Sequence, residues 1–216
     1  MSFDLESLDE KRFQDNTGID SQTLERFKVW RAALIKANEH TNLVGRSSLD
    51  SFWLRHAYDS WQVYALSPKT KTWVDLGSGA GFPGLAIAFC IQGQCDDSKI
   101  YLIEAKIKKA QFLQNVSRET SAPTYIINKR IEDLLSPPKV GVVTARALAP
   151  LYKLLNYVRP FMTKETVALL PKGERYQQEL DEARKKWKFD CDVHPSKTNF
   201  CSKILQIRNL SILNGK

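Results

Sequence analysis

Residues 75–84 combine residue types that can hold a nucleotide-like ligand. They read Asp-Leu-Gly-Ser-Gly-Ala-Gly-Phe-Pro-Gly and lie between a short apolar run, 72–74, and an apolar segment, 85–89, that is typical of a buried helix. Glycines let the backbone turn sharply and approach a ligand closely, and the N-terminus of the following helix adds partial positive charge. This stretch therefore predicts a ligand site where a strand turns into a helix.

The spacing of the glycines leaves two ligands open. The dinucleotide fingerprint Gly-x-Gly-x-x-Gly fails when it is counted from Gly77, but Gly79, Gly81 and Gly84 satisfy it. Asp75, at the end of the preceding strand, favours a cationic cofactor. A carboxylate repels phosphates and attracts the sulfonium and ammonium groups of S-adenosyl-L-methionine. We therefore predict S-adenosyl-L-methionine, with a dinucleotide or a turn without a ligand as the alternatives.

Further candidates for cofactor binding follow the next two predicted strands. In an open parallel sheet, ligands bind beyond the carboxyl ends of the strands. Glu104 ends the second strand at an offset suited to accepting hydrogen bonds from ribose hydroxyls; alternatively, it caps the next helix. Ile131 and Glu132 follow the third strand, where a backbone edge and an apolar side chain suit adenine, or where a helix simply begins.

Two cations end the fourth and fifth predicted strands. Arg146 and Lys172 should therefore lie on the same edge of the sheet as the glycines. Cations beside a cationic cofactor favour an anionic substrate such as RNA, and the alternative is a pair of surface charges.

A possible catalytic triad occurs in the N-terminal part of the chain. His56, Asp59 and Ser60 lie at positions i, i+3 and i+4, which share one helix face but lack the strand-turn-helix context of a nucleophile. A structural hydrogen-bond cluster between the N-terminal helices and the sheet is the favoured interpretation.

The composition suggests a polyanionic partner. The net charge is +8, the isoelectric point is near 9.3, and basic residues concentrate at 106–109, 129–130 and 184–188, which are alternatively solvated helix faces.

The four cysteines lack zinc-site spacing, which favours free thiols in a reducing cytoplasm, and we expect no metal. Neither a membrane-spanning run nor a secretion signal is evident, so a cytoplasmic protein is expected.

The order of apolar segments predicts an α/β fold. Residues 1–66 are expected to form a helical cap. A loose arm or short helix is expected at 1–20, and a helix is expected from Ser21, with that residue as its N-cap. A second amphipathic stretch covers 48–64. In the compact unit 67–216, strands are expected at 72–76, 99–103, 124–127, 140–144 and 166–170, with helices at 82–91, 106–120, 151–158 and 174–186. Two last strands, 188–193 and 203–208, must pair antiparallel, since no helix fits between them. Alternation with a closing hairpin is typical of the Rossmann-like methyltransferase sheet.

Several motifs together give the chain a resemblance to a known family. They occur in the order Asn42-Leu43, Arg55-His56-x-x-Asp59-Ser60, the glycine stretch with its Gly-Phe-Pro-Gly end, Arg130-x-Glu132, Arg146-Ala147 and Lys172-Gly173. Over roughly residues 24–210 the chain resembles the small-subunit ribosomal RNA methyltransferase G family, also called glucose-inhibited division protein B. The resemblance implies a class I methyltransferase fold and a bacterial enzyme that methylates N7 of one guanine in 16S rRNA, in a loop near the decoding centre.

The resemblance also implies site residues and a partner. It implies cofactor contacts at Gly77, Phe82, Ile131, Glu132 and Arg146, and 16S rRNA or a small-subunit precursor as substrate. We expect the protein to be a monomer.

This chain departs from the family at two places. The family often carries an arginine in the last strand, where this chain has Ser202-Lys203, so Lys203 joins Arg146 and Lys172 as an RNA candidate. Pro171 is the other departure, and it could reshape the end of the fifth strand because proline donates no ladder hydrogen bond.

The expected reaction needs no catalytic base. Guanine N7 already has an exposed lone pair, so an enzyme has only to align N7 with the methyl group and exclude water. We therefore assign no catalytic residue. The alternatives are a methyltransferase of a small molecule or a protein, and a non-catalytic RNA-binding protein with the same fold.

Overall fold

The computed structural model describes residues 8–67, 69–92 and 97–213. Its strands are β1 (Thr72–Leu76), β2 (Lys99–Ile103), β3 (Thr124–Ile127), β4 (Val142–Thr144), β5 (Val167–Lys172), β6 (Trp187–Pro195) and β7 (Lys203–Ile212). They form one seven-stranded sheet in the order β3-β2-β1-β4-β5-β7-β6. Strands β1 to β5 are parallel, whereas β7 is antiparallel to both of its neighbours.

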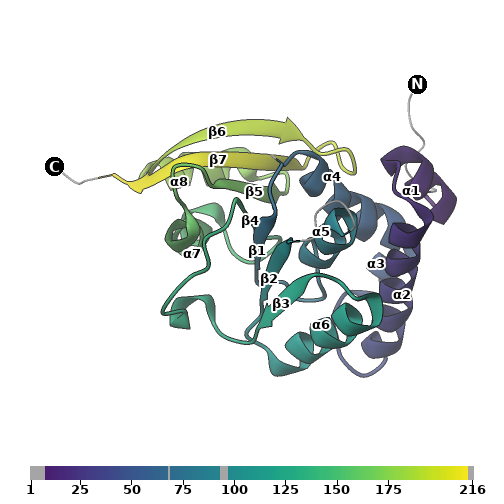
Figure 1. Cartoon of the computed structure of the whole chain (residues 1–216). Helices are drawn as coiled ribbons and strands as arrows, with labels where there is room; N and C mark the ends of the chain where they lie inside the picture. The colour runs from purple at the N-terminus through teal and green to yellow at the C-terminus, as the bar shows by residue number, and fades with distance from the viewer. Residues whose placement is uncertain (1–7, 68, 93–96, 214–216) are drawn as a thin grey trace.

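Helices cover both faces of this sheet (Figure 1). They are α1 (Glu10–Thr17), α2 (Ser21–Asn38), α3 (Arg46–Asp50), a π-helical turn (Trp53–Tyr58), α4 (Asp59–Ala65), α5 (Gly84–Ile91), α6 (Ile107–Thr120), α7 (Leu151–Val158) and α8 (Tyr176–Arg184), with 3-10 turns at Ile131–Asp133 and Arg159–Phe161. The cluster of buried side chains that includes α1, α2, α5 and α6 lies on one face, and the cluster that includes α7 and α8 lies on the other.

The predicted alternation of strands and helices is confirmed. Strands β1, β2 and β3 and helix α7 have the predicted bounds, and the two last strands pair antiparallel as expected. Strand β4 begins two residues later than predicted, at Val142, and β5 continues to Lys172. Pro171 lies in register with Ile204 of β7, so it does not end the strand.

The N-terminal helices differ from the prediction in detail. Ser21 is not the N-cap of α2; the cap is Asp20, whose Oδ1 accepts a hydrogen bond from the Thr23 N–H at 2.6 Å. That hydrogen bond lowers the pKa of Asp20. The stretch 48–64 is not one helix, because the π-helical turn separates α3 from α4.

Buried aromatic rings join the N-terminal helices to the sheet. Trp30 of α2 packs against Phe52, Phe82 and Phe89, with ring centroids 5.6, 4.5 and 5.7 Å away. Phe13 of α1 is fully buried beside Phe27 of α2. Aromatic pairs at such separations add to the free energy gained by burial alone. The helices before β1 therefore share one apolar core with α5 and this face of the sheet.

Candidate functional site

The loop between β1 and α5 has the conformation that its glycines permit. Gly77, Gly79 and Gly81 have φ of 69°, 59° and 102°, a region that other residues rarely adopt. Gly84 is required for a different reason: a Cβ there would lie 2.3 Å from Leu102 and 2.7 Å from Asp75 Oδ2. The glycine loop, residues 77–84, is thus held close to the sheet.

Asp75 lies beneath this loop. The residue is 1% exposed, and its Oδ2 accepts a hydrogen bond from the Gly84 N–H at 3.1 Å. Its Oδ1 is buried and has no hydrogen-bond partner among the described residues. Burial raises the pKa of Asp75 to about 7, because the ionised form loses its solvation.

Glu104 connects the glycine loop to the next helix. Its Oε2 accepts a hydrogen bond from the Gly79 N–H at 2.9 Å, and its Oε1 accepts one from the Lys106 N–H at 2.8 Å, where α6 begins. The structure therefore contains the helix-capping contact that was the alternative to a ribose role. Each carboxylate oxygen has a second lone pair, so the contact does not prevent the side chain from accepting a ligand hydroxyl.

Ile131 and Glu132 lie in the 3-10 turn that follows β3. Ile131 is half-buried against the apolar cluster on the α7 side, and Glu132 is exposed. Because β3, β2 and β1 are neighbours, this turn, Glu104 and the glycine loop follow adjacent strands at one edge of the sheet.

Arg146 joins the end of β4 to the N-terminal helices. Its Nη1 donates to Asp59 Oδ2 at 2.9 Å and to the Arg55 carbonyl at 3.0 Å. Its Nη2 lies 3.0 Å from His56 Nδ1. The guanidinium also lies over the Phe82 ring, 4.9 Å from its centroid, in a cation–π arrangement.

His56 is neutral in this arrangement. Burial and the charges of Arg146 and Arg55 lower its pKa to about 3. Since arginine only donates, Nδ1 must be the acceptor and the proton lies on Nε2. The His56 ring stacks on Phe82 with centroids 4.3 Å apart. The expected hydrogen-bond cluster thus includes His56 and Asp59, whereas Ser60 Oγ is buried and has no hydrogen-bond partner in the described part of the chain.

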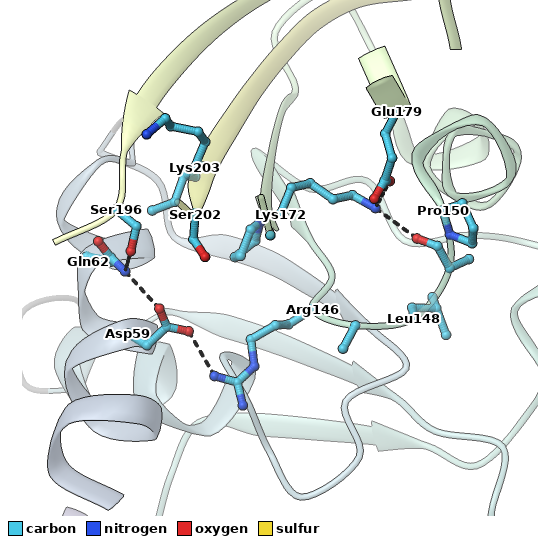
Figure 2. A pocket seen from close by; sticks show the side chains of 15 residues that line it. Asp59, Gln62, Arg146, Leu148, Pro150, Lys172, Glu179, Ser196, Ser202 and Lys203 are labelled. Carbon is cyan, nitrogen blue, oxygen red and sulfur yellow. Dashed lines mark hydrogen bonds and ion pairs between the residues drawn. The ribbon is translucent and has the colours of Figure 1, made fainter. Parts of the chain in front are cut away.

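A cavity of about 500 Å³ opens beyond the ends of β4 and β5 (Figure 2). Arg146, Lys172 and Lys203 all line it, so the three predicted RNA candidates are brought together. The other predicted cofactor residues do not line it. Leu148 does, and a Cβ on Gly77 would lie 2.6 Å from its side chain. The cavity and the glycine loop therefore adjoin across Leu148.

The two lysines are held by different partners. Lys172 is largely buried, and its Nζ donates to Glu179 Oε2 and to the Ala149 carbonyl, both at 2.8 Å. Lys203 Nζ donates to the Phe200 carbonyl at 2.9 Å and lies over the Tyr176 ring.

Sequence reasoning missed several residues that line the cavity. Gln62 of α4, Glu179 of α8, and Ser196 and Ser202 beside the β6–β7 loop come from segments far apart in the chain. Asp59, which also lines the cavity, carried a signal through its spacing from His56. These four residues carried none, because no local pattern specifies which distant loops meet. Ala147, next to Arg146, has a φ of 54°, which is strained for a residue with a Cβ.

Within residues 8–67, 69–92 and 97–213, no group of three or more His, Cys, Asp or Glu side chains could hold a metal ion. Cys90, Cys191 and Cys201 are free thiols, and Cys95 lies outside the described residues. No helix in the described part is both long and apolar enough to cross a bilayer.

The sheet order, the closing antiparallel hairpin and the glycine loop after β1 define the Rossmann-like class I methyltransferase fold. The SAH-bound Podospora anserina methyltransferase PaMTH1 superposes with a TM-score of 0.57 at 12% identity, covering 96% of this chain and 97% of that one. M. jannaschii TYW2 in complex with AdoMet gives a TM-score of 0.52 at 15% identity, covering 69% of this chain and 72% of that one.

The chain belongs to the rRNA small subunit methyltransferase G family, whose family model matches residues 23–210. Relatives named ribosomal RNA small subunit methyltransferase G include a Caulobacter vibrioides protein, 38% identical over 94% of this chain and 93% of that protein. A Rhizobium meliloti relative of the same name is 41% identical over 89% of this chain and 92% of that protein. The family predicted from the motifs is thereby confirmed.

Proposed function

We propose that this protein transfers a methyl group from S-adenosyl-L-methionine to N7 of a single guanine in 16S rRNA, in the loop near the decoding centre. One observation carries the proposal: the glycine loop adjoins, across Leu148, a cavity lined by Arg146, Lys172 and Lys203. A site for a cofactor and a site for an anionic substrate thus lie side by side at the carboxyl edge of the sheet. Membership of the methyltransferase G family supports the same reaction.

The residues around the glycine loop fit S-adenosyl-L-methionine. Only Gly77 O and Lys109 Nζ come within 4 Å of a Cβ built on Gly79, at 3.8 and 3.9 Å, so a ligand can approach the backbone there. Asp75 Oδ1 is buried and has no hydrogen-bond partner among the described residues, and above its pKa of about 7 the ionised carboxylate adds negative potential that suits a cation. When bound, the cofactor supplies an electrophilic methyl group on a sulfonium.

Each predicted cofactor residue has a proposed role. Glu104 accepts the ribose hydroxyls with lone pairs that its backbone contacts leave free. Ile131 and Glu132 border the adenine. Asp75, Gly77, Gly79 and Gly81 shape the loop, and Phe82 supports it from below, with Arg146 acting through the Phe82 ring on which it lies.

The protein has little proton chemistry to perform. His56 Nδ1 already accepts from Arg146, so it is not available as a base, and N7 needs none. The cavity has instead to hold guanine in line with the methyl group and keep water out. Arg146, Lys172 and Lys203 line the cavity together with Asp59 and Glu179, so the lining carries one more positive than negative charge, which favours the phosphates of RNA.

Transfer of labelled methyl tests this function. The protein is incubated with labelled S-adenosyl-L-methionine and small-subunit RNA or particles that lack the modification, and the nucleosides are then mapped. Label in 7-methylguanosine at one position supports the proposal. Label on a small molecule or a protein, with none on rRNA, supports the first alternative, and RNA binding without cofactor affinity in calorimetry supports the second.

We further propose that the protein acts as a monomer in the cytoplasm, where small-subunit rRNA is located. One chain supplies both the glycine loop and the cavity, which supports a monomer. Light scattering after gel filtration tests it, since a particle twice the chain mass would contradict it.

A further inference from the structure

An exposed aromatic residue stands two positions before Ser202, which lines the cavity. Phe200, in the loop of residues 196–202 between β6 and β7, is 93% exposed. The other phenylalanines in the described residues are buried or half-buried. A single exposed apolar side chain is common on protein surfaces and is not by itself a site. Two further observations support a binding role for this ring: the loop is held in place by hydrogen bonds, and the residues around the ring are polar and cationic.

Helix α4 holds this loop in place. Asp59 Oδ1 accepts a hydrogen bond from Thr198 Oγ1 at 2.8 Å. Gln62 Oε1 accepts one from the Lys197 N–H at 2.8 Å, and Gln62 Nε2 donates to Ser196 Oγ at 3.1 Å. Figure 2 shows Asp59, Gln62 and Ser196 facing one another at the edge of the cavity. The loop that carries Phe200 is therefore fixed to the same helix whose Asp59 binds Arg146.

The tip of the loop is also ordered internally. Asn199 Oδ1 accepts from the Cys201 N–H at 2.8 Å, and its carbonyl accepts from the Ser202 N–H at 3.0 Å. The backbone around Phe200 is thus set before any ligand arrives. A preorganised side chain loses less conformational entropy on binding than one on a free loop.

The surroundings of Phe200 are polar and cationic. Its neighbours from 197 to 203 are Lys, Thr, Asn, Cys, Ser and Lys, so the ring is not part of a wider apolar patch in sequence. Lys203 Nζ lies on the Phe200 carbonyl, and Ser196, Ser202 and Lys203 line the cavity. A lone aromatic ring among cations suits a nucleobase and its phosphates, whereas protein interfaces bury contiguous apolar cores.

We propose that Phe200 stacks on an unpaired base of the RNA substrate next to the methylated guanine, while Lys197 and Lys203 contact the adjoining phosphates. This inference rests on the proposed function and adds to it a binding residue outside the cavity. Stacking is tolerant of sequence because every base has a π-face, so Phe200 contributes affinity and register, and the cavity selects the guanine.

Four variants test the ring. Phe200→Ala removes it, Phe200→Trp keeps a stacking surface, and Phe200→Leu keeps an apolar side chain without one. Leu135→Ala is the matched control, because Leu135 is 97% exposed in the loop that follows the 3-10 turn at 131–133 and does not line the cavity. For each variant we would measure the Kd for a single-stranded RNA of the substrate loop by anisotropy, the KM and kcat for rRNA, and the cofactor Kd by calorimetry.

Phe200→Ala is expected to raise the Kd and KM for RNA about tenfold, with cofactor Kd and melting temperature unchanged. Phe200→Trp should restore wild-type affinity, Phe200→Leu should not, and Leu135→Ala should have no effect. An RNA Kd within about twofold of wild type for Phe200→Ala, or full rescue by leucine, would overturn the inference. If the wild-type protein methylates no rRNA, the proposed function fails, but the RNA-binding comparison still decides whether Phe200 stacks.

Discussion

At the scale of single residues, the site is determined by backbone that only glycine can provide and by a carboxyl group that water cannot reach. Gly79 has a positive φ, and a Cβ built on it would meet Gly77 O and Lys109 Nζ only at 3.8 and 3.9 Å. Asp75 lies under the loop, and its Oδ1 has no hydrogen-bond partner among the described residues. Both features are local, and each can be changed without altering the rest of the sheet.

Substituting Gly79 by valine should abolish cofactor binding. A β-branched side chain at a φ of 59° is strained by about 1–2 kcal/mol or more, and its atoms would fill the space above the backbone. Calorimetric titration with S-adenosyl-L-methionine should show no measurable heat of binding. Gly45→Ala is the control, because Gly45 has a φ of −63° and an added Cβ meets only Ser48 Oγ at 4.0 Å. Unchanged affinity in Gly79→Val would place the cofactor elsewhere.

Asp75 should make the stability of the protein depend on pH. Its pKa rises from 3.8 in the unfolded chain to about 7 in the fold, so the native state binds the extra proton between these values. The contribution of Asp75 to stability therefore falls as pH rises from about 4 to 7, by on the order of 4 kcal/mol. Asp75→Asn should lose this dependence, because its amide oxygen still accepts from Gly84 without ionising. The free energy of unfolding of both proteins would be measured at pH 5 and at pH 8. If it changes equally in the two proteins between these pH values, Asp75 ionises without a cost in stability.

At the scale of elements, the N-terminal helices support the glycine loop directly. Trp30 Nε1 of α2 donates to the Ala80 carbonyl at 3.0 Å, and the Trp30 and Phe82 rings pack 4.5 Å apart. Helix α4 and the π-helical turn reach the same loop through His56. We therefore propose that the predicted cap at 1–66 and the predicted unit at 67–216 unfold in one transition.

Trp30→Phe should lower both stability and cofactor affinity. Phenylalanine keeps one six-membered aromatic ring, but the buried hydrogen bond to the loop is lost, which costs about 1–2 kcal/mol, and the missing five-membered ring leaves a cavity that adds to this cost. Trp187→Phe is the matched control: Trp187 Nε1 donates to the Tyr152 carbonyl at 3.2 Å on the other face of the sheet. Both variants should melt earlier, and only Trp30→Phe should raise the cofactor Kd. If Trp30→Phe and Trp187→Phe bind the cofactor equally well, α2 does not influence cofactor binding through the glycine loop.

Arg146→Ala should reduce methyl transfer far more than it reduces stability. The substitution removes the contacts with Asp59, His56 and Phe82 that join β4 to the helices beside the cavity. We expect a loss of at least about a hundredfold in kcat/KM, equivalent to about 3 kcal/mol, and a melting temperature only a few degrees lower. Arg146→Lys should recover little, because an ammonium cannot make the same forked contacts. Activity that falls only in step with the folded fraction would make Arg146 purely structural.

The sequence predicted elements better than the contacts between them. Alternating apolar and glycine signals located β1, β2, β3 and α7 to the residue, because local periodicity determines them. The contacts of Asp59 and Gln62 with residues 196–198, more than 130 positions away, left no local trace. The N-cap at Asp20 was missed because Asp20 and Ser21 are both good caps and only the geometry decides between them.

At the scale of the whole molecule, the net positive charge acts on RNA binding at long range. The chain carries a net charge of +8, and three cations meet at one cavity. Long-range attraction between this protein and a polyanion should therefore be strong and screened by salt.

RNA affinity and cofactor affinity should thus respond differently to ionic strength. If about four phosphates are neutralised, the association constant for RNA falls roughly fiftyfold between 50 and 200 mM salt, with a log–log slope near −2.8 for single-stranded RNA. The cofactor Kd should change by less than about twofold over the same range. Anisotropy and calorimetry in the same buffers measure both. A flat salt response for RNA would mean that the positive charge does not contact the substrate.

The packing of Trp30 against the glycine loop has a practical consequence for anyone who wants a smaller enzyme. A truncated chain that started at residue 67 would keep every strand and the glycine loop, yet it would expose to water the apolar side chains of α5 that pack against the N-terminal helices. Such a surface promotes aggregation. We therefore expect that the first third of this sequence cannot be removed, and that a minimal catalytic fragment of this protein has to include α2 and α4.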